Sequence, residues 1–361
     1  MYPRRRRLAA TTATVAAVGS ALLLAACSSS SNPPSSSTSS GATALSGTLN
    51  GSGSTFQLVF QQSAIQSFKS VQSGMTVNYS GVGSGTGRTN LAANTVNFAG
   101  SDSPIPSTET ANFKGKTVLY FPVVIGPITM AYNLPNLSKP LQLNAKVIAD
   151  IFQAKIKTWN NSEIAAINPG VTLPSTPITL AVRSDSSGTT QNFSLFLVDA
   201  AGSDWTLGSS STITWPSTAH AVSGNSGVAQ AIKSTPGAIG YVDYSTAKAS
   251  GLTFASVQNK DGKYIAPSVA AASAAAAGVT VASDLTFHAV WGTGATAYPI
   301  TYQSWDLVYA KQANANDVKM LQAYLGYLLG AGQQLLPSLN YAPLPSSIDQ
   351  MAKAQLSKIT S

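Results

Sequence analysis

Cysteine, histidine and charged residues are all scarce in this 361-residue sequence. One cysteine and two histidines are present, and Asp, Glu, Lys and Arg together make up 9% of the chain. A single cysteine excludes an intrachain disulfide and a cysteine metal cluster. Two histidines, His220 and His288, offer little for a histidine metal site. We therefore expect no metal and no other cofactor.

Positive charge is scarce beyond the first few residues. The net charge is +8, but four of these charges are Arg4 to Arg7, so the rest of the chain carries about +4. No Lys/Arg cluster remains that would indicate nucleic-acid binding. Only two other arginines, Arg88 and Arg183, are present. An arginine this rare is a candidate for a specific role.

The N-terminal pattern predicts a lipoprotein signal peptide over residues 1–26. Four arginines precede an apolar stretch, which ends in Leu-Ala-Ala directly before Cys27. Basic residues followed by a short apolar run are typical of secretory signals. Threonine and glycine interrupt the run, which makes it a poor permanent membrane span. Cys27 would then carry a lipid such as palmitate and become the new N-terminus.

Serine dominates the next segment, residues 27–44, which we expect to be a tether. Such a composition cannot bury apolar surface and favours a flexible linker. The protein is therefore expected to be extracytoplasmic and lipid-anchored to the outer face of the cell membrane. A Gram-positive surface is the preferred setting, and a Gram-negative periplasm stays open.

Strand and helix patterns alternate over residues 45–361, which predicts an α/β fold with mainly parallel central sheets. This segment of about 315 residues is long for one core, so two lobes are expected. The alanine-rich residues 270–277 are expected to form a surface helix or a loop. The expected strands cover 75–79, 96–99, 118–124 with a break at Pro122, 178–182 and 238–242, and the expected helices cover 56–68, 88–94, 144–152, 189–198, 228–233 and 317–329.

Three loops rich in glycine and hydroxyl residues, 50–56, 81–87 and 183–189, lie before expected helices. Backbone amides at a helix start lack intrahelical acceptors, and the helix dipole favours an anion there. Serine and threonine also cap ordinary helices, so one such loop is a weak signal. Three loops favour an anion site, and Arg183 in the third adds a fork of donors suited to an oxyanion.

Asp102 follows the expected strand 96–99 and would repel an anion held nearby. An ionised carboxylate only accepts hydrogen bonds, so it favours an oxyanion that still carries a proton. Phosphate carries one at neutral pH, whereas sulfate does not, and Asp102 would discriminate against sulfate. From this loop alone, a cap on the turn before Pro104 is an equally good interpretation.

Several catalytic signatures are absent from the sequence. The glycine run 81–87 fits neither the P-loop nor the dinucleotide-binding spacing, and no nucleophile elbow occurs. Neither histidine lies in a recognisable triad motif. The sequence leaves a pair of glycosidase carboxylates open, although no pair stands out. We therefore expect a protein that is not an enzyme.

The chain resembles the phosphate-binding subunit of the bacterial high-affinity phosphate ABC transporter, a periplasmic phosphate-binding protein, from about residue 48 to about residue 347. The order and spacing of eight segments carry the resemblance. They are GSGSTF at 51–56, NYSGVGSG at 78–85, NTVNFAGSD at 94–102, DIFQAKIKTW at 150–159, INPG at 167–170, RSDSSGT at 183–189, PGAIGYVD at 236–243 and YAPLP at 341–345.

The resemblance implies a phosphate site residue by residue. Asp102 would accept the ligand proton, Arg183 would supply the formal positive charge, and Asp185 would hold the Arg183 fork. Where the family has more glycine and serine after the position of Ser84, this chain has Arg88, which we expect to face solvent. The other implied phosphate ligands are Thr55, Phe56, Ser84, Ser187, Gly188 and Thr189.

The resemblance also implies a two-lobed periplasmic-binding-protein fold of type II, with hinged lobes and the ligand cleft between them. Lobe I would comprise 45–125 and 298–361, and lobe II 126–297. The implied function is capture of inorganic phosphate, as a monomer, for an ABC permease and ATPase. The alternatives are arsenate as the ligand, a phosphate sensor or surface protein, and a secreted phosphatase on the same scaffold.

Overall fold

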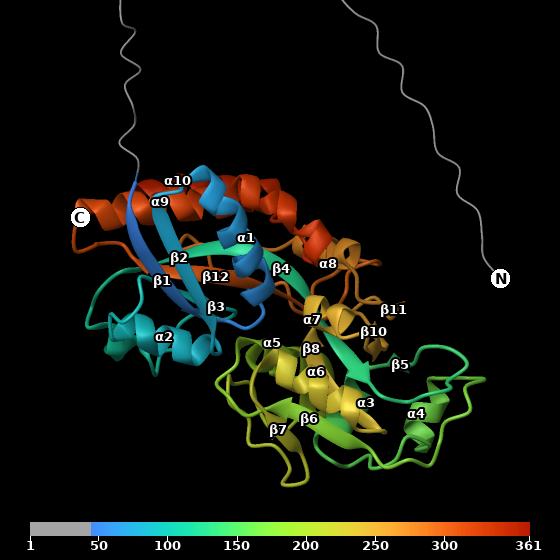
Figure 1. The fold of residues 1–361 in the computed structure, drawn as a ribbon. Helices are drawn as coiled ribbons and strands as arrows, with labels where there is room; N and C mark the ends of the chain where they lie inside the picture. The colour runs from blue at the N-terminus through green and yellow to red at the C-terminus, as the bar shows by residue number, and fades with distance from the viewer. Residues whose placement is uncertain (1–44) are drawn as a thin grey trace, which may run out of the picture. The chain divides into compact units, whose positions relative to one another are not determined.

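The computed structural model describes residues 45–361 and confirms the prediction of an α/β fold (Figure 1). The signal peptide, Cys27 and the tether, which we predict for residues 1–44, lie outside the described residues. Within residues 45–361, none of the helices combines the length and the apolar character that crossing a membrane requires.

Twelve strands and ten α-helices make up the described chain. The strands are β1 (Gly47–Gly53), β2 (Met75–Gly81), β3 (Phe98–Ser101), β4 (Val118–Tyr132), β5 (Gln142–Leu143), β6 (Thr179–Arg183), β7 (His220–Val222), β8 (Ala238–Asp243), β9 (Thr253–Phe254), β10 (Ser256–Gln258), β11 (Tyr264–Ile265) and β12 (Thr301–Tyr309). The helices are α1 (Leu58–Val71), α2 (Ser84–Ala92), α3 (Ala145–Phe152), α4 (Ser162–Ala166), α5 (Gly188–Ala201), α6 (Gly224–Ser234), α7 (Tyr244–Ala249), α8 (Val269–Ala276), α9 (Ala315–Leu329) and α10 (Ser346–Gln355).

One large sheet has the order β2-β1-β3-β12-β4-β8-β6-β7, with β9 also paired to β4. Its two outer parts are parallel, β1 to β3 at one end and β6 to β8 at the other. The central strands β12 and β4 run antiparallel to each other and to their outer neighbours. The sheet is therefore mixed rather than mainly parallel, because the two strands that join its parallel parts run in opposite directions.

Strand β4 connects the two halves of this sheet, one with β1 to β3 and the other with β6 to β8. It pairs with β12 up to Pro127 and with β8 from Ile128 onward. We call the β1–β3 part with α1 and α2 the first lobe, and the β6–β8 part with α3, α5 and α6 the second lobe. The change of partner lies next to the boundary at 125/126 that we predict for the lobes, and the division of the remaining chain between lobes stays a prediction.

Strand β4 has 15 residues, and all but the first are buried. A strand that is covered on both faces reads as a continuous apolar run, as this one does. We expected Pro122 to break the strand, but the strand continues through it. The register between β4 and β12 shifts at Ser304/Trp305, opposite Pro122 and Val124. This irregularity accommodates a residue that has no N–H to donate.

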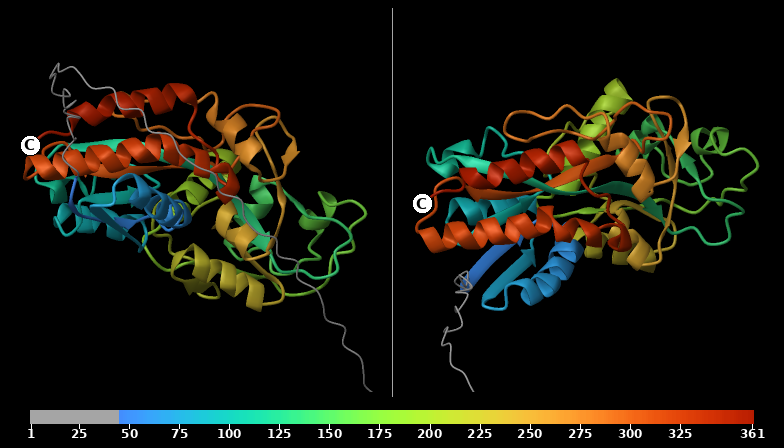
Figure 2. Two further views of the ribbon diagram at one scale, coloured as in Figure 1. Left: turned by 45° about the horizontal axis from the view of Figure 1, so that its top comes forward. Right: turned by 90° about the horizontal axis from the view of Figure 1, so that it is seen from above.

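Helices cover both faces of the first lobe's sheet. Helices α1, α9 and α10 lie on one side and α2 on the other (Figure 1). Helices α9 and α10 run side by side in both views of Figure 2. In the second lobe, α3 packs on α5, and both α5 and α6 contact β8. The helices that begin at the expected glycine loops are thus held against the sheet.

Most of the expected elements are present with shifted ends. Helix α2 begins at Ser84, so most of the second glycine loop is already helical. The alanine-rich stretch forms α8, and four of its alanines are buried beside β4 and β12 rather than exposed. Strands β1 and β12 were not among our expected strands. Both lie inside the sheet, β1 between β2 and β3, and β12 between β3 and β4.

Arg88 is buried, and our expectation that it faces solvent is wrong. Its side chain is 1% exposed and binds both carboxylate oxygens of Glu109, at 2.7 and 2.8 Å. Its third nitrogen, Nη1, donates to the hydroxyls of Ser101 and Ser103, at 3.1 and 3.2 Å. These two serines flank Asp102, so Arg88 supports the loop that carries the predicted proton acceptor.

We expect Arg88→Lys to lower the free energy of unfolding by about 2 kcal/mol, because an ammonium cannot replace the bidentate fork in a buried ion pair. Urea denaturation would measure the change. Glu109→Gln serves as the partner variant, since it keeps one acceptor and removes the charge. An unfolding free energy of Arg88→Lys equal to that of the wild type would contradict the structural role.

Candidate anion-binding site

The starts of α2, α5 and α6 meet the segment that precedes α1, and the predicted ligand residues from both lobes lie there. Asn225, at the start of α6, donates through Nδ2 to Thr55 Oγ1 at 3.2 Å and to Thr189 Oγ1 at 3.4 Å. Asp102 and Ser84 lie against Gly188 at the start of α5. Helix starts present free amides, so their convergence favours an anion.

Asp102 and Ser84 form the first-lobe side of this cluster. Both side chains are buried, and Ser84 Oγ lies 3.3 Å from Asp102 Oδ2 and 3.2 Å from the Asp102 amide nitrogen. A Cβ atom on Gly188 would lie only 2.5 Å from Asp102 Cβ and from Ser84 Oγ. Only glycine allows the start of α5 to approach so closely.

Arg183 and Asp185 form the ion pair that the family resemblance implies. Arg183 Nε donates to Asp185 Oδ1 at 2.7 Å, and Nη2 contacts the other carboxylate oxygen. The remaining nitrogen, Nη1, donates to Asn225 Oδ1 at 3.3 Å. The Gly224 amide also donates to Asp185 Oδ1, at 3.0 Å. The guanidinium plane is therefore fixed from two sides.

Ser187 and Thr189 frame the first turn of α5. Ser187 is the N-cap of this helix, and its Oγ accepts a hydrogen bond from the Thr190 amide at 3.1 Å. The hydroxyl proton stays available for a second partner, because a hydroxyl both donates and accepts. Ser187 and Thr189 are both buried. They present hydroxyls beside Gly188 at the positive end of the helix dipole.

Thr55 and Phe56 form the remaining predicted edge. Thr55 is half-buried and contacts Asn225, as described above. The Phe56 amide donates to Ser54 Oγ at 3.1 Å. The Phe56 ring stacks on Tyr302, with ring centroids 4.1 Å apart, and packs edge-on against Tyr341. These aromatic contacts fix the backbone at this edge of the site.

The site holds little net positive charge. Burial raises the pKa of Asp102 to about 6, against the lowering effect of hydrogen bonds from Ser304, Ser54 and Ser84 and the charge of Arg183. Asp102 is therefore mostly ionised at neutral pH. Burial also acts to raise the pKa of Asp185, but the Arg183 guanidinium outweighs it and lowers that pKa. One cation thus faces two carboxylates, and hydrogen bonds must supply most of the attraction for an anion.

The two lobes touch beside the site. The Gly85 amide of α2 donates to the Ser186 carbonyl at 3.1 Å. A Cβ atom on Gly85 would lie 2.0 Å from Ser186 Oγ and 2.4 Å from Ser186 Cβ. The described conformation is therefore closed at this point.

Three residues at the site were missed by our sequence reasoning. Asn225 lies in a loop between a strand and a helix, as the Arg183 loop does. The segment Ser223-Gly224-Asn225 before an apolar helix is therefore a sequence signal that could have identified Asn225 as a site residue. Asn192 donates through Nδ2 to the Asp102 carbonyl at 2.7 Å, and Ser304 donates to the Asp102 carboxylate. Nothing in the local sequence of Asn192 or Ser304 indicates these contacts.

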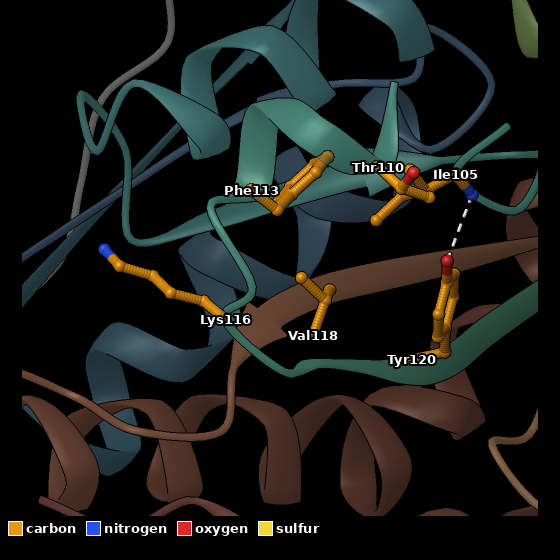
Figure 3. A pocket seen from close by; sticks show the side chains of 6 residues that line it. All are labelled: Ile105, Thr110, Phe113, Lys116, Val118 and Tyr120. Atoms are coloured by element: carbon orange, nitrogen blue, oxygen red, sulfur yellow. Dashed lines mark hydrogen bonds between the residues drawn. The ribbon is translucent and has the colours of Figure 1, made fainter. Parts of the chain in front are cut away.

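A pocket of about 220 Å³ lies outside this site, between β4 and the short 3-10 helix Thr110–Phe113, and Figure 3 shows the six side chains that line it. None of them is a predicted site residue. Over residues 45–361, no group of three or more His, Cys, Asp or Glu side chains is arranged to hold a metal ion. Both histidines are exposed.

Residues 38–331 match the family model of the PBP superfamily domain. The chain is 33% identical over 318 residues to the phosphate-binding protein PstS of Pasteurella multocida (strain Pm70), which covers 87% of this chain and 91% of that protein. It is 34% identical over 312 residues to the phosphate-binding protein PstS 3 of Mycobacterium leprae (strain TN), with coverages of 83% and 84%.

The fold is also similar to solved structures. One of them is a high affinity periplasmic phosphate-binding protein (PfluDING), solved with bound phosphate at pH 8.5. The TM-score is 0.71 at 23% identity, and the match covers 86% of this chain and 94% of that one. At this identity the likeness concerns the fold alone.

We expect Gly85→Ala to weaken the binding of the predicted ligand, phosphate, at least about tenfold, because the added methyl group separates the two lobes where they touch. Alanine favours a helix, so the thermal stability of the ligand-free protein should not fall. Titration calorimetry and thermal melting measure the two quantities. Gly278→Ala is the control, since a Cβ there meets nothing within 4 Å. Equal affinity in both variants would show that lobe contact at Gly85 is irrelevant to binding.

Proposed function

Since this chain belongs to the PBP superfamily and, within it, to the PstS phosphate-binding proteins, we propose that it captures inorganic phosphate outside the cytoplasm and delivers it to an ABC-type importer. The observation that carries this proposal is the meeting of Asp102 with Ser84 and the start of α5 in one buried cluster. A lone carboxylate among helix-start amides and hydroxyls suits an oxyanion that brings its own proton.

We assign each predicted residue a role in this site. Asp102 accepts the hydrogen bond from the protonated phosphate oxygen, and Arg183 donates to a charged one. The hydroxyls of Thr55, Ser84, Ser187 and Thr189 donate to the remaining oxygens, together with the amides of Thr55, Phe56, Gly188 and Thr189. The Phe56 amide, which donates to Ser54 Oγ at 3.1 Å, would share its hydrogen with the ligand. Asp185 holds the guanidinium in place and offsets part of its charge. Affinity then rests on many charge-assisted hydrogen bonds.

The protein is a binding protein rather than an enzyme, in line with the PstS relatives, which are named phosphate-binding proteins. No observation in the structure favours the sensor or the secreted phosphatase that the sequence left open. Its partners are therefore the membrane subunits of an importer, which would recognise the closed form produced by hinge closure around phosphate. A monomeric state is part of this proposal.

We expect calorimetry to show one-to-one phosphate binding to the ligand-free protein and little or no sulfate binding. Arg183→Ala should weaken phosphate binding by about 100-fold or more, because it removes a buried charged donor. Lys319→Ala, which removes an exposed positive charge of α9, is the control for net charge. Equal phosphate affinity in the Arg183→Ala variant and in this control would refute the proposed site.

We expect Asp102→Asn to reduce the ratio of phosphate to sulfate affinity by at least about 100-fold, because an amide can donate to a fully ionised oxygen. The same titrations at neutral pH measure this ratio. Unchanged rejection of sulfate in the variant would show that Asp102 is not the proton acceptor.

Delivery and anchoring are tested in cells. In a strain that lacks its own phosphate-binding protein, the wild-type chain should restore phosphate uptake and Arg183→Ala should not. Cys27→Ser should abolish palmitate labelling and release the chain from the membrane fraction, since the proposed lipid is attached at that sulfur. If Arg183→Ala restores phosphate uptake as fully as the wild type, delivery to the importer is contradicted. If palmitate labelling persists in Cys27→Ser, the lipid anchor at Cys27 is contradicted.

A further inference from the structure

Ser304 of β12 makes the shortest contact to the Asp102 carboxylate. Its Oγ lies 2.5 Å from Asp102 Oδ1, and both residues are buried. Asp102 Oδ2 is on the side of Ser84 and Gly188, where the anion is expected. The two carboxylate oxygens therefore have different environments.

Ser304 has one hydroxyl proton and two acceptors within reach. Asp102 Oδ1 lies at 2.5 Å and the Ser101 carbonyl at 3.2 Å. Gln57 Nε2, 2.7 Å away, can only donate to the Ser304 oxygen. The proton of Ser304 is therefore directed away from Gln57 and toward the charged and nearer acceptor, Asp102.

The orientation of Gln57 is fixed by its other contacts. Its Nε2 also lies 2.9 Å from the carbonyl of Trp305, which is an acceptor only. Its Oε1 accepts from Gln61 Nε2 at 2.9 Å. Both amide hydrogens of Gln57 are thus used, and a flipped amide would place its oxygen against the Trp305 carbonyl.

Gln61 continues the same chain of hydrogen bonds. Its second amide hydrogen points to the Asp306 carboxyl, at 3.0 and 3.2 Å, and its oxygen accepts from the Tyr324 hydroxyl at 2.6 Å. Burial raises the pKa of Asp306 to about 7, and in either charge state one of its oxygens accepts. Asp306 therefore anchors Gln61 as the Trp305 carbonyl anchors Gln57.

We propose that Ser304 is a positioning residue that sets the ligand selectivity of this site, with Gln57 and Gln61 aligned behind it. This inference rests on the proposed phosphate function. Ser304 occupies Asp102 Oδ1 and keeps the carboxylate ionised. Oδ2, which accepts only the longer bond from the Ser84 hydroxyl at 3.3 Å, is then the acceptor for a protonated oxyanion when that hydroxyl turns to the ligand. Neutral hydrogen-bond donors thus stabilise the ionised carboxylate of Asp102 in place of a second cation.

Other groups around Asp102 also affect its charge state. Arg183 attracts its negative charge, and Asp243 repels it. Tyr79, Tyr302 and Tyr341 are neutral there because burial raises the pKa of each well above the ordinary value. The Ser84 hydroxyl also donates to the carboxylate, at 3.3 Å, but among the groups that lower the pKa of Asp102, Ser304 has the largest effect.

The sign of the effect follows from the charge state of Asp102. A protonated Asp102 can donate to a fully ionised anion, so sulfate begins to bind as the pH falls through the pKa of Asp102. Loss of the Ser304 hydroxyl removes a bond to the charged form and raises that pKa. In Ser304→Ala, sulfate should therefore bind at a higher pH than in the wild type.

Carbon-13 NMR of the ligand-free protein, with the Asp carboxyl carbons labelled and Asp102→Asn used for assignment, measures the Asp102 titration directly. We expect the midpoint of Ser304→Ala to rise by at least about half a pH unit, and that of Gln57→Leu by less. Ser338→Ala, which removes an exposed hydroxyl outside the site, should leave the Asp102 midpoint unchanged.

Titrations with phosphate and sulfate at about pH 5 to 8 then measure selectivity. At about pH 6.5, the ratio of phosphate to sulfate affinity in Ser304→Ala should fall at least about threefold, the factor that a rise of about half a pH unit implies, and that of Gln57→Leu should fall less. If the wild type binds phosphate but neither variant changes the Asp102 titration midpoint or the phosphate-to-sulfate affinity ratio, the inference about Ser304 is overturned and the proposed function stands. A wild type that binds no phosphate would overturn the proposed function, and the NMR midpoint would still decide the role of Ser304.

Discussion

The antiparallel pairing of β4 with β12 is the contact on which the rest of the molecule depends. Strand β4 carries the sheet from one lobe into the other, and β12 brings Ser304 to Asp102 from more than 200 residues away in sequence. The same strands bury Phe56 beneath Tyr302. If the lobes move about β4, motions that keep this pairing would open the proposed site while Ser304 stays beside Asp102.

The proposed site would hold an anion with almost no net positive charge. Arg183 is largely offset by Asp185, and Asp102 adds a further negative charge. Helix starts, hydroxyls and one amide side chain, Asn225, replace formal charge. Hydrogen bonds have directions, whereas charge attracts every anion alike. Selectivity is therefore a consequence of keeping the site nearly neutral.

Local patterns predicted the local parts of this structure. The α/β class and most strands and helices follow from residue periodicity, and the resemblance to a known family placed Arg183 beside Asp185. Arg88 was misread because its partner Glu109 is 21 residues away. Ser304 and Asn192 reach Asp102 only through tertiary packing, which leaves no trace in their own neighbourhoods. The antiparallel centre of the sheet was missed because β12 was not recognised as a strand.

Ser187 gives helix α5 a start that depends on the same hydroxyl that would bind the ligand. Its oxygen accepts from the Thr190 amide, and its proton is left to donate. One hydroxyl group can therefore cap the helix and would also be able to donate to the anion. Ligand binding should then slow the exchange of the backbone amide hydrogens in the first turn of α5. Folding of this turn and recognition of the ligand become parts of a single cooperative event.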